Sequence, residues 1–117
     1  MNENIIKQIR IFKNAAEKQF QFTKDGNWRK ANTESKKMTT SYRKLKEDGI
    51  DGEKALLELT ECDKSEVASI AAVYAMRFNP DKCLNVLRNI SKQNIPIISS
   101  DAKQAIENWE NGEWYIE

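Results

Sequence analysis

Apolar side chains recur every three or four positions along the first half of the chain, and this spacing constrains the fold most strongly. One stripe runs along residues 3–23 and a second along residues 28–45. A period of three to four residues matches the α-helix, whereas a half-buried β-strand shows a period of two. Only two prolines and four glycines occur among the 117 residues, so little interrupts long helices. We therefore expect an all-α protein.

The two stripes predict an N-terminal helical hairpin over residues 1–50. The first stripe contains Ile5, Ile9, Phe12, Ala16 and Phe20. The second contains Trp28, Ala31, Ser35, Met38, Tyr42 and Leu45. Gly26 is suited to the C-cap of the first helix, and Gly49 is the stop signal of the second. The stripes are too short for a free coiled coil, so antiparallel pairing within the domain is favoured.

Residues 51–117 predict shorter helices, because their apolar runs are brief and are separated by polar breaks. Three helix starts are expected from capping patterns: Asp63 with Glu66, Asn79 before Pro80, and Asp101 with Gln104. Gly112 is expected to close the last helix. IPIISS, residues 95–100, is expected to be a short extended connection. The chain of residues 1–117 is thus expected to form a single domain of about six helices in antiparallel pairs.

One of these helices is unusually rich in small side chains. Residues 63–76, DKSEVASIAAVYAM, contain alanine or serine at six positions and no glycine. A phosphate-binding loop would need glycines and a preceding strand. Small side chains instead let neighbouring helix backbones approach closely, so the run is interpreted as a packing surface.

The residue types limit the chemistry that the chain can perform. No histidine is present, which excludes Ser–His and Cys–His nucleophile pairs. Cys62 and Cys83 lack CxxC spacing and are expected to be free thiols rather than zinc ligands. We therefore expect no enzyme activity, no metal and no cofactor.

No apolar run approaches the roughly 20 residues that span a bilayer. The N-terminal residues 1–14 mix charge into every turn, which argues against a signal peptide. A cytoplasmic protein without a membrane partner is the resulting expectation.

Charge is divided unevenly along the chain. Residues 1–50 hold twelve Lys and Arg against six Asp and Glu, a balance of +6, and residues 51–117 hold seven against twelve, a balance of −5. Acidic residues beside aromatic ones are typical of protein interfaces with basic partners. The candidate partner-binding residues are Glu58, Glu61, Asp63, Glu66, Glu107, Glu110, Glu113, Trp114 and Tyr115, and Glu117 follows them.

Other interpretations of these residues stay open. Glu107 and Trp109 fit a solvated helix face with the tryptophan in the core, and Asp63 with Glu66 fits a capping pair. Residues 28–46 carry seven Lys and Arg interleaved with Trp28 and Tyr42, which is compatible with a nucleic-acid-binding face. The near-neutral pI of about 7.7 argues against binding driven by phosphate neutralisation.

Two segments carry a family resemblance. LLELTECDKSEVASIAAVYAM, residues 56–76, resembles a HEAT repeat, and LNVLRNI, residues 84–90, is similar to the start of another. Ala68 departs from the pattern, because HEAT repeats usually carry arginine just after the valine. With NWRKAN at 27–32 and WENG at 109–112, residues 10–114 resemble a bacterial family catalogued as a domain of unknown function.

The resemblance implies both a fold and a function. The implied fold is a HEAT-like short α-solenoid in which residues 51–117 form the helix pairs and the N-terminal hairpin is a cap. Members of the family are similar to immunity proteins of polymorphic or contact-dependent toxin systems. The implied function is one-to-one binding that occludes the active site of a cognate toxin, such as a nuclease. The alternative is a helical scaffold or adaptor for proteins or nucleic acid.

Overall fold

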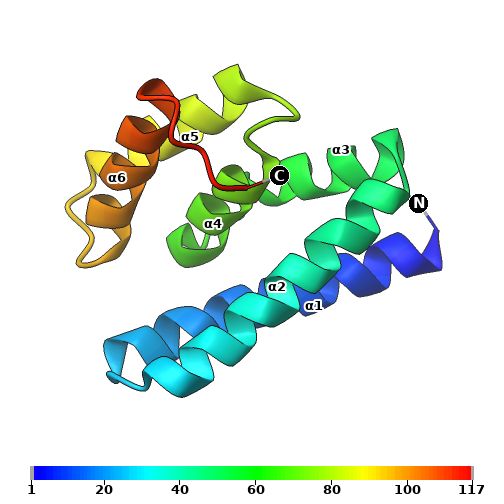
Figure 1. Cartoon of the computed structure of the whole chain (residues 1–117), viewed down its shortest axis with the longest axis horizontal. Coiled ribbons are helices and arrows are strands. Elements are labelled where there is room, and N and C mark those ends of the chain that lie inside the picture. The colour runs from blue at the N-terminus through cyan, green and yellow to red at the C-terminus, as the bar shows by residue number, and fades with distance from the viewer. Residues whose placement is uncertain (1, 117) are drawn as a thin grey trace. The chain divides into compact units, whose positions relative to one another are not determined.

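The structure, a computed structural model, describes residues 2–116 and contains six helices with no strand in that range. The all-α expectation is therefore confirmed, and contacts between neighbouring helices agree with antiparallel pairing. The helices are α1 (Glu3–Lys24), α2 (Trp28–Glu47), α3 (Ile50–Leu59), α4 (Ser65–Ala75), α5 (Pro80–Ser91) and α6 (Ile98–Glu110) (Figure 1). Glu117, named above beside the acidic residues, lies outside the described residues.

The chain divides into two compact units after Leu59. The first unit contains α1, α2 and α3, and the second contains α4, α5 and α6. Helix α3, which follows the predicted hairpin of residues 1–50, packs against both α1 and α2. The first unit is therefore a hairpin with a short third helix.

Local sequence explains the turn of the hairpin. Gly26 has a φ of +74°, a conformation that glycine adopts without steric cost. The Gly26 N–H donates to the Thr23 carbonyl at 3.1 Å, and the Asn27 N–H donates to the Phe22 carbonyl at 2.8 Å. This Schellman arrangement ends α1, and the Asn27 side chain then accepts from the Lys30 N–H at 3.2 Å to begin α2. Adjacent residues thus end one helix and cap the next.

Both predicted stripes supply the core of the first unit, although Ile9, Phe20 and Ser35 are only half-buried. Ile5 and Phe12 of α1 are fully buried, as is Leu45 of α2. Trp28, predicted to lie on the second stripe, is instead 65% exposed. It is the first residue of α2, one turn before the first buried residue of that helix, Ala31. The predicted position of Trp28 in the core is therefore wrong.

Gly52 controls how closely α3 approaches α2. A Cβ atom at this position would overlap the backbone carbonyl of Leu45. Gly52 is buried and Leu56, one turn further along α3, is fully buried. The absence of a side chain at position 52 is therefore what permits this contact.

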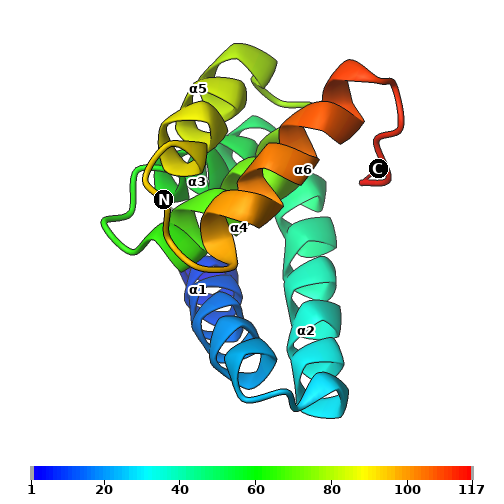
Figure 2. The ribbon, with the colours of Figure 1, turned by 90° about the vertical axis from the view of Figure 1, so that its left-hand side faces the viewer.

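Helix α4 is the most deeply buried element of the second unit. Seven of its eleven residues are buried, and they are Val67, Ala68, Ala71, Ala72, Val73, Tyr74 and Ala75. Helix α4 packs against α5 and α6, which also pack against each other (Figure 2). Because most of these residues are small, helix backbones can lie close together. The interpretation of the alanine-rich run as a packing surface agrees with this arrangement.

The start of α4 differs from the prediction. The helix begins at Ser65 and its N-cap residue is Lys64, which provides no side-chain cap. Asp63 lies one residue before the cap position, so the predicted capping pair of Asp63 with Glu66 is wrong. Glu66 still lies in the first turn, where a carboxylate interacts favourably with the helix dipole.

The start of α5 agrees with the prediction. The Asn79 side chain accepts from the Lys82 N–H at 3.1 Å, and Pro80 occupies the first helical position. The proline needs no N–H there, because the first amides of a helix have no partner within it. The Asn79–Pro80 prediction is confirmed.

The connection into α6 is tighter than the predicted extended segment. Ile97 has a φ of +70°, and the Ile98 N–H donates to the Pro96 carbonyl at 2.8 Å, which closes a γ-turn. Helix α6 therefore begins at Ile98, and Asp101 lies in its first turn rather than at its cap. The predicted capping pair of Asp101 and Gln104 is wrong because the helix starts four residues earlier, with Ile97 at the cap position.

Ser99 holds this connection in place. Its hydroxyl donates to the Ile90 carbonyl at 2.7 Å and accepts from the Ile95 N–H at 2.8 Å. The side chain is buried and joins the end of α5 to the first turn of α6. One serine thus satisfies the Ile95 amide and adds a further bond to the Ile90 carbonyl, which also accepts from the Gln93 N–H at 3.1 Å.

Candidate protein-binding site

The chain reverses direction at the C-terminal end of α6. Gly112 has a φ of +75°, and its N–H donates to the Trp109 carbonyl at 3.2 Å. The Glu113 N–H donates to the Asn108 carbonyl at 2.8 Å, which completes a Schellman motif. This geometry confirms the prediction that Gly112 closes the helix. The motif fixes the direction in which residues 113–116 leave α6.

Three aromatic side chains meet at this turn. The rings of Trp109 and Trp114 lie edge to face, with centroids 5.5 Å apart and planes at 86°. The Tyr115 ring lies 5.4 Å from that of Trp114. Trp109 and Trp114 are half-buried, whereas Tyr115 is 64% exposed. The two tryptophans therefore support a tyrosine that is available to a partner.

The segment after the turn is also tied to the end of α4. The Arg77 side chain, two residues beyond the last residue of α4, donates through Nε to the Ile116 carbonyl at 2.8 Å. Both residues belong to the second unit. Tyr115 thus lies between two anchors, the stacked Trp114 on one side and the bonded Ile116 on the other.

Three exposed carboxylates precede this tyrosine in the sequence. Glu107 and Glu110 are exposed on α6, and Glu113 is exposed just after Gly112. Glu110 makes an ion pair with Arg88 of α5 at 3.9 Å, and both side chains are about half exposed. An exposed pair of this kind contributes only about 0–1 kcal/mol. We call Glu107, Glu110, Glu113, Trp114 and Tyr115 the C-terminal patch.

The second predicted acidic cluster is divided between the two units. Glu58 is exposed on α3 of the first unit, whereas Glu61, Asp63 and Glu66 belong to the second. Glu61 makes an ion pair with Lys82 at 3.5 Å. Glu61, Asp63 and Glu66 therefore form one group around the start of α4, and Glu58 belongs to the other unit.

A cavity of about 200 Å³ lies beside the C-terminal patch, and no sequence pattern had indicated it. It is lined by Ile70 and Val73 of α4, by Asp101, Gln104, Ala105 and Asn108 of α6, and by Tyr115. Burial raises the pKa of the Asp101 carboxyl above its ordinary value. Positions 101, 104, 105 and 108 follow a helical period and so share one face of α6, but spacing alone does not show that α4 and Tyr115 complete a cavity there.

The pKa of the Tyr115 hydroxyl agrees with the proximity of these groups. Tyr115 is 64% exposed as a whole, yet the partial burial of its side chain raises this pKa first, and the charges of Tyr74 and Asp101 raise it further. Tyr74 belongs to α4 and Asp101 to α6. The tyrosine ring therefore borders a space that contains the Asp101 carboxylate.

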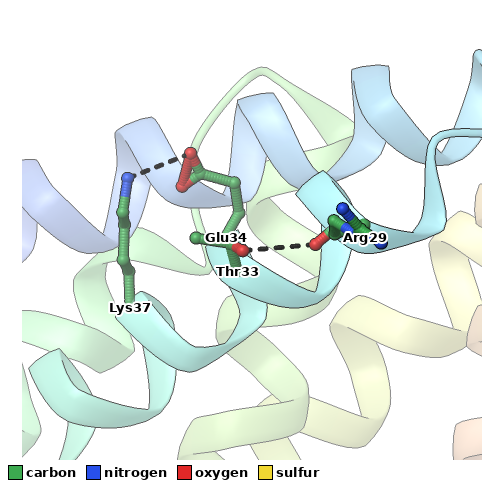
Figure 3. A network of polar contacts seen from close by, with 4 residues as sticks. All are labelled: Arg29, Thr33, Glu34 and Lys37. Carbon is green, nitrogen blue, oxygen red and sulfur yellow. Dashed lines mark hydrogen bonds and ion pairs between the residues drawn. The ribbon is translucent and has the colours of Figure 1, made fainter.

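A basic surface lies on α2 of the first unit. A cavity of about 320 Å³ is lined by Lys36, Lys37 and Lys44 together with Gln8, Ile11, Thr33, Thr40 and Ser41. Figure 3 shows the local network, in which the Thr33 hydroxyl donates to the Arg29 carbonyl at 3.2 Å. Because Thr33 and Thr40 both donate to backbone carbonyls, their hydroxyl protons are not available to an anion.

Glu34 interrupts this basic surface from within. Its side chain is 7% exposed, and Oε1 lies 3.2 Å from Lys37 Nζ (Figure 3). Oε2 is buried and has no hydrogen-bond partner among residues 2–116. Part of the positive charge on α2 is therefore neutralised by its own helix.

The cysteines and the remaining ionisable groups form no metal-binding cluster in the part of the chain that the structure describes. Cys62 is half-buried and Cys83 is buried, and neither forms a disulfide, as predicted. Burial raises the pKa of Cys83 to about 11, an effect that Lys82 partly opposes. The Cys83 thiol is therefore protonated and unreactive at neutral pH.

None of the described helices is long and apolar enough to cross a membrane.

No family model, curated protein or solved structure matches this chain. The resemblance carried by NWRKAN and WENG therefore stays a prediction.

Proposed function

We propose that this chain is a binding protein that acts as an immunity protein in the cytoplasm and neutralises a cognate bacterial toxin domain by occluding its active site. A basic nuclease domain is the target class that best matches acidic residues on the binding surface. The observation that carries the proposal is Tyr115, which is 64% exposed and anchored on both sides.

This surface needs little further ordering when a partner binds. Exposed aromatic side chains in well-defined positions contribute most of the energy of many interfaces. The Schellman turn at Gly112 and the Arg77 bond to Ile116 already restrict the tail. The chain would thus lose less conformational entropy when a partner binds Tyr115 than when a free tail is ordered.

The carboxylates of the C-terminal patch favour a basic partner. Glu107, Glu110 and Glu113 are exposed carboxylates of the same C-terminal segment as Tyr115, with Glu110 partly compensated by Arg88, and acidic groups accelerate association with a basic cleft. No catalytic group is needed for inhibition of this kind.

The first experiment identifies the partner. The tagged chain is used at low salt to isolate proteins from its native organism, and mass spectrometry determines what co-elutes. One stoichiometric partner with a toxic domain would support the proposal. Nucleic acid, or many partners at substoichiometric amounts, would contradict it.

The second experiment locates the interface by charge reversal. In one variant Glu107, Glu110 and Glu113 become lysine, and in the matched variant Glu58, Glu61 and Asp63 become lysine. Both variants reverse three carboxylates at or near the surface. We expect slower association and weaker salt dependence for the first variant only, measured by stopped-flow or surface plasmon resonance. The opposite result would assign the interface to the residues reversed in the second variant.

A second candidate function is nucleic-acid binding by α2, and the exposure of Trp28 favours it. Trp28 is exposed enough to stack on a base, and Arg29, Lys30, Lys36, Lys37, Arg43, Lys44 and Lys46 follow it in the same helix. Fluorescence anisotropy with single-stranded and double-stranded oligonucleotides tests this candidate. Binding that weakens with salt and with Trp28→Ala would support it, and no binding at low salt would exclude it.

A further inference from the structure

We propose that the cavity between α4, α6 and Tyr115 is a binding site for the guanidinium group of an arginine side chain supplied by a protein partner. The inference depends on the proposed function only for the source of the arginine. The cavity itself is defined by side chains of the second unit alone.

The charge of the cavity lining favours a cation. Among the described residues that line the cavity, Asp101 is the one carboxyl group, and none is lysine or arginine. The Asp101 carboxylate has no ion pair among residues 2–116, and burial alone raises its pKa. Asp101 is exposed at the cavity, so a cation entering it would meet a negative charge that no lysine or arginine of the lining compensates.

The hydrogen-bond acceptors of the lining suit a guanidinium group. The Gln104 side chain donates through Nε2 to Asn108 Oδ1 at 2.9 Å. This bond leaves Gln104 Oε1 available to accept from a ligand, in addition to the Asp101 oxygens. A guanidinium group carries five N–H donors in a plane and can bond to several acceptors at once.

Apolar and aromatic side chains form the other walls of the cavity. Ile70, Val73 and Ala105 line the cavity and can contact the methylene groups of an arginine stem. Tyr115 provides an aromatic ring on which a guanidinium group can stack. The site is thus apolar where an arginine side chain is apolar and polar where it is charged.

Size and composition argue against drug-sized ligands, anions and metal ions. A volume of about 200 Å³ is below the roughly 300–1,000 Å³ of pockets for drug-sized ligands. An anion would be repelled by Asp101. A metal ion would lack ligands, because no group of three His, Cys, Asp or Glu side chains gathers within residues 2–116.

The arginines of the second unit do not supply the cation themselves. Arg77 bonds to the Ile116 carbonyl, and Arg88 pairs with Glu110. Because Tyr115 borders the cavity and also belongs to the C-terminal patch, a partner that contacts Tyr115 could place an arginine in the cavity.

The test uses the full chain and a small probe, so it does not require the partner. N-acetyl-arginine amide, which carries only the guanidinium charge, is titrated while amide chemical shifts are recorded by NMR. We expect shift changes centred on residues 101–108 and Tyr115. N-acetyl-citrulline amide, its neutral isostere, should produce none. Equal responses to the two probes, or changes centred elsewhere, would overturn the assignment.

Variants of the cavity then test its individual groups. Asp101→Asn should weaken binding of the arginine probe at least about tenfold, because a charge-assisted bond is lost. Tyr115→Leu should weaken it about two- to fivefold through loss of the ring. Asp81→Asn is the matched control, since Asp81 occupies the first turn of α5 as Asp101 occupies that of α6. Unchanged probe binding by Asp101→Asn, in a variant with a native NMR spectrum, would overturn the proposal.

The outcomes for the cavity and for the proposed function can be separated. Failure of the arginine probe together with tight binding of a toxin partner would remove only the cavity assignment. Probe binding by the wild type, lost in Asp101→Asn, would support the cavity even if no toxin partner is found.

Discussion

The two units bury their helices in different ways. In the first unit, α1 extends over 22 residues and buries five of them, on one face. In the second unit, α4 extends over 11 residues and buries seven. A long helix with one apolar face tolerates charge over most of its surface. A short helix buried on several faces must instead consist of small and apolar residues, so its sequence is far more restricted.

The units also differ in how they treat a buried polar side chain. Ser99 in the second unit donates one hydrogen bond and accepts another, both with backbone groups. Glu34 in the first unit pairs with Lys37 through one oxygen, and its buried Oε2 has no partner within residues 2–116. Satisfied buried groups stabilise a fold, whereas unsatisfied ones are costly. We therefore expect opposite responses to their removal.

Gly52→Ala should produce the largest loss of stability. The added Cβ atom would overlap the Leu45 backbone carbonyl, which cannot move aside as a flexible side chain can. We expect a loss of about 3 kcal/mol in the free energy of unfolding, measured by urea denaturation. Gly26→Ala is the control, because a Cβ at position 26 would meet open space and only the φ of +74° opposes alanine, at about 1 kcal/mol. Equal losses would show that α3 adjusts its position freely.

Ala71→Leu tests the close packing of α4 in the second unit. Ala71 is fully buried, and three added carbon atoms should overpack its surroundings at a cost of about 1–3 kcal/mol. Asn89→Leu on the exposed face of α5 is the control and should change stability little. A stable Ala71→Leu variant would mean that the small residues are not required for packing.

Ser99→Ala should destabilise the second unit by about 1–2 kcal/mol, because the Ile90 carbonyl and the Ile95 amide lose a buried partner. Thermal unfolding monitored by circular dichroism provides the measurement. Ser100→Ala is the matched control, since the neighbouring serine is exposed. If both variants unfold at the same temperature, the two bonds of Ser99 contribute nothing net.

Glu34→Met should have the smallest effect and the opposite sign. Removing the buried carboxylate eliminates an unsatisfied oxygen and leaves Lys37, which is half exposed, free to interact with water. We expect unchanged stability or a gain of up to about 1 kcal/mol in denaturant unfolding. Lys37→Met should be the more damaging change, because it leaves the Glu34 charge without its partner. A loss above about 1 kcal/mol for Glu34→Met would mean that the carboxylate is structural.

Periodicity and punctuation predicted most of the fold. The stripes that contain Phe12 and Leu45 are buried, and the glycines at 26, 49 and 112 all have positive φ values. These features depend on local backbone geometry, which a few neighbouring residues determine. The predicted helix ends are therefore accurate where glycine or Asn79–Pro80 defines them.

The errors have a common physical origin. Asp63 and Asp101 both match capping patterns, yet the helices begin at Ser65 and Ile98. In α6 the γ-turn at Ile97 and the bonds of Ser99 satisfy the backbone before Asp101 is reached. Tertiary contacts thus determine at which residue each of these helices begins, and the local sequence alone does not. Trp28 lies outside the core for a related reason, because a helical stripe does not show where the interface itself begins.

The candidate site was predicted only in part. The acidic and aromatic residues near the C-terminal end of α6 were singled out from the sequence; the glutamates and Tyr115 are exposed, and their role in binding stays a prediction. The cavity beside Tyr115 was missed, because its lining combines α4, α6 and the tail. Residues as far apart as Ile70 and Tyr115 come together only in the folded unit. The HEAT-like resemblance and the toxin partner stay predictions.

The bond between Arg77 and Ile116 has a consequence for how recognition could diversify. Its acceptor is a backbone carbonyl, so the anchor does not depend on the side chain at position 116. The Gly112 turn likewise depends on backbone amides and carbonyls. The exposed residues between them, Glu113 and Tyr115, can be exchanged without altering the frame that presents them. In the binding surface proposed above, the bonds that hold the tail are therefore independent of the side chains that a partner would contact.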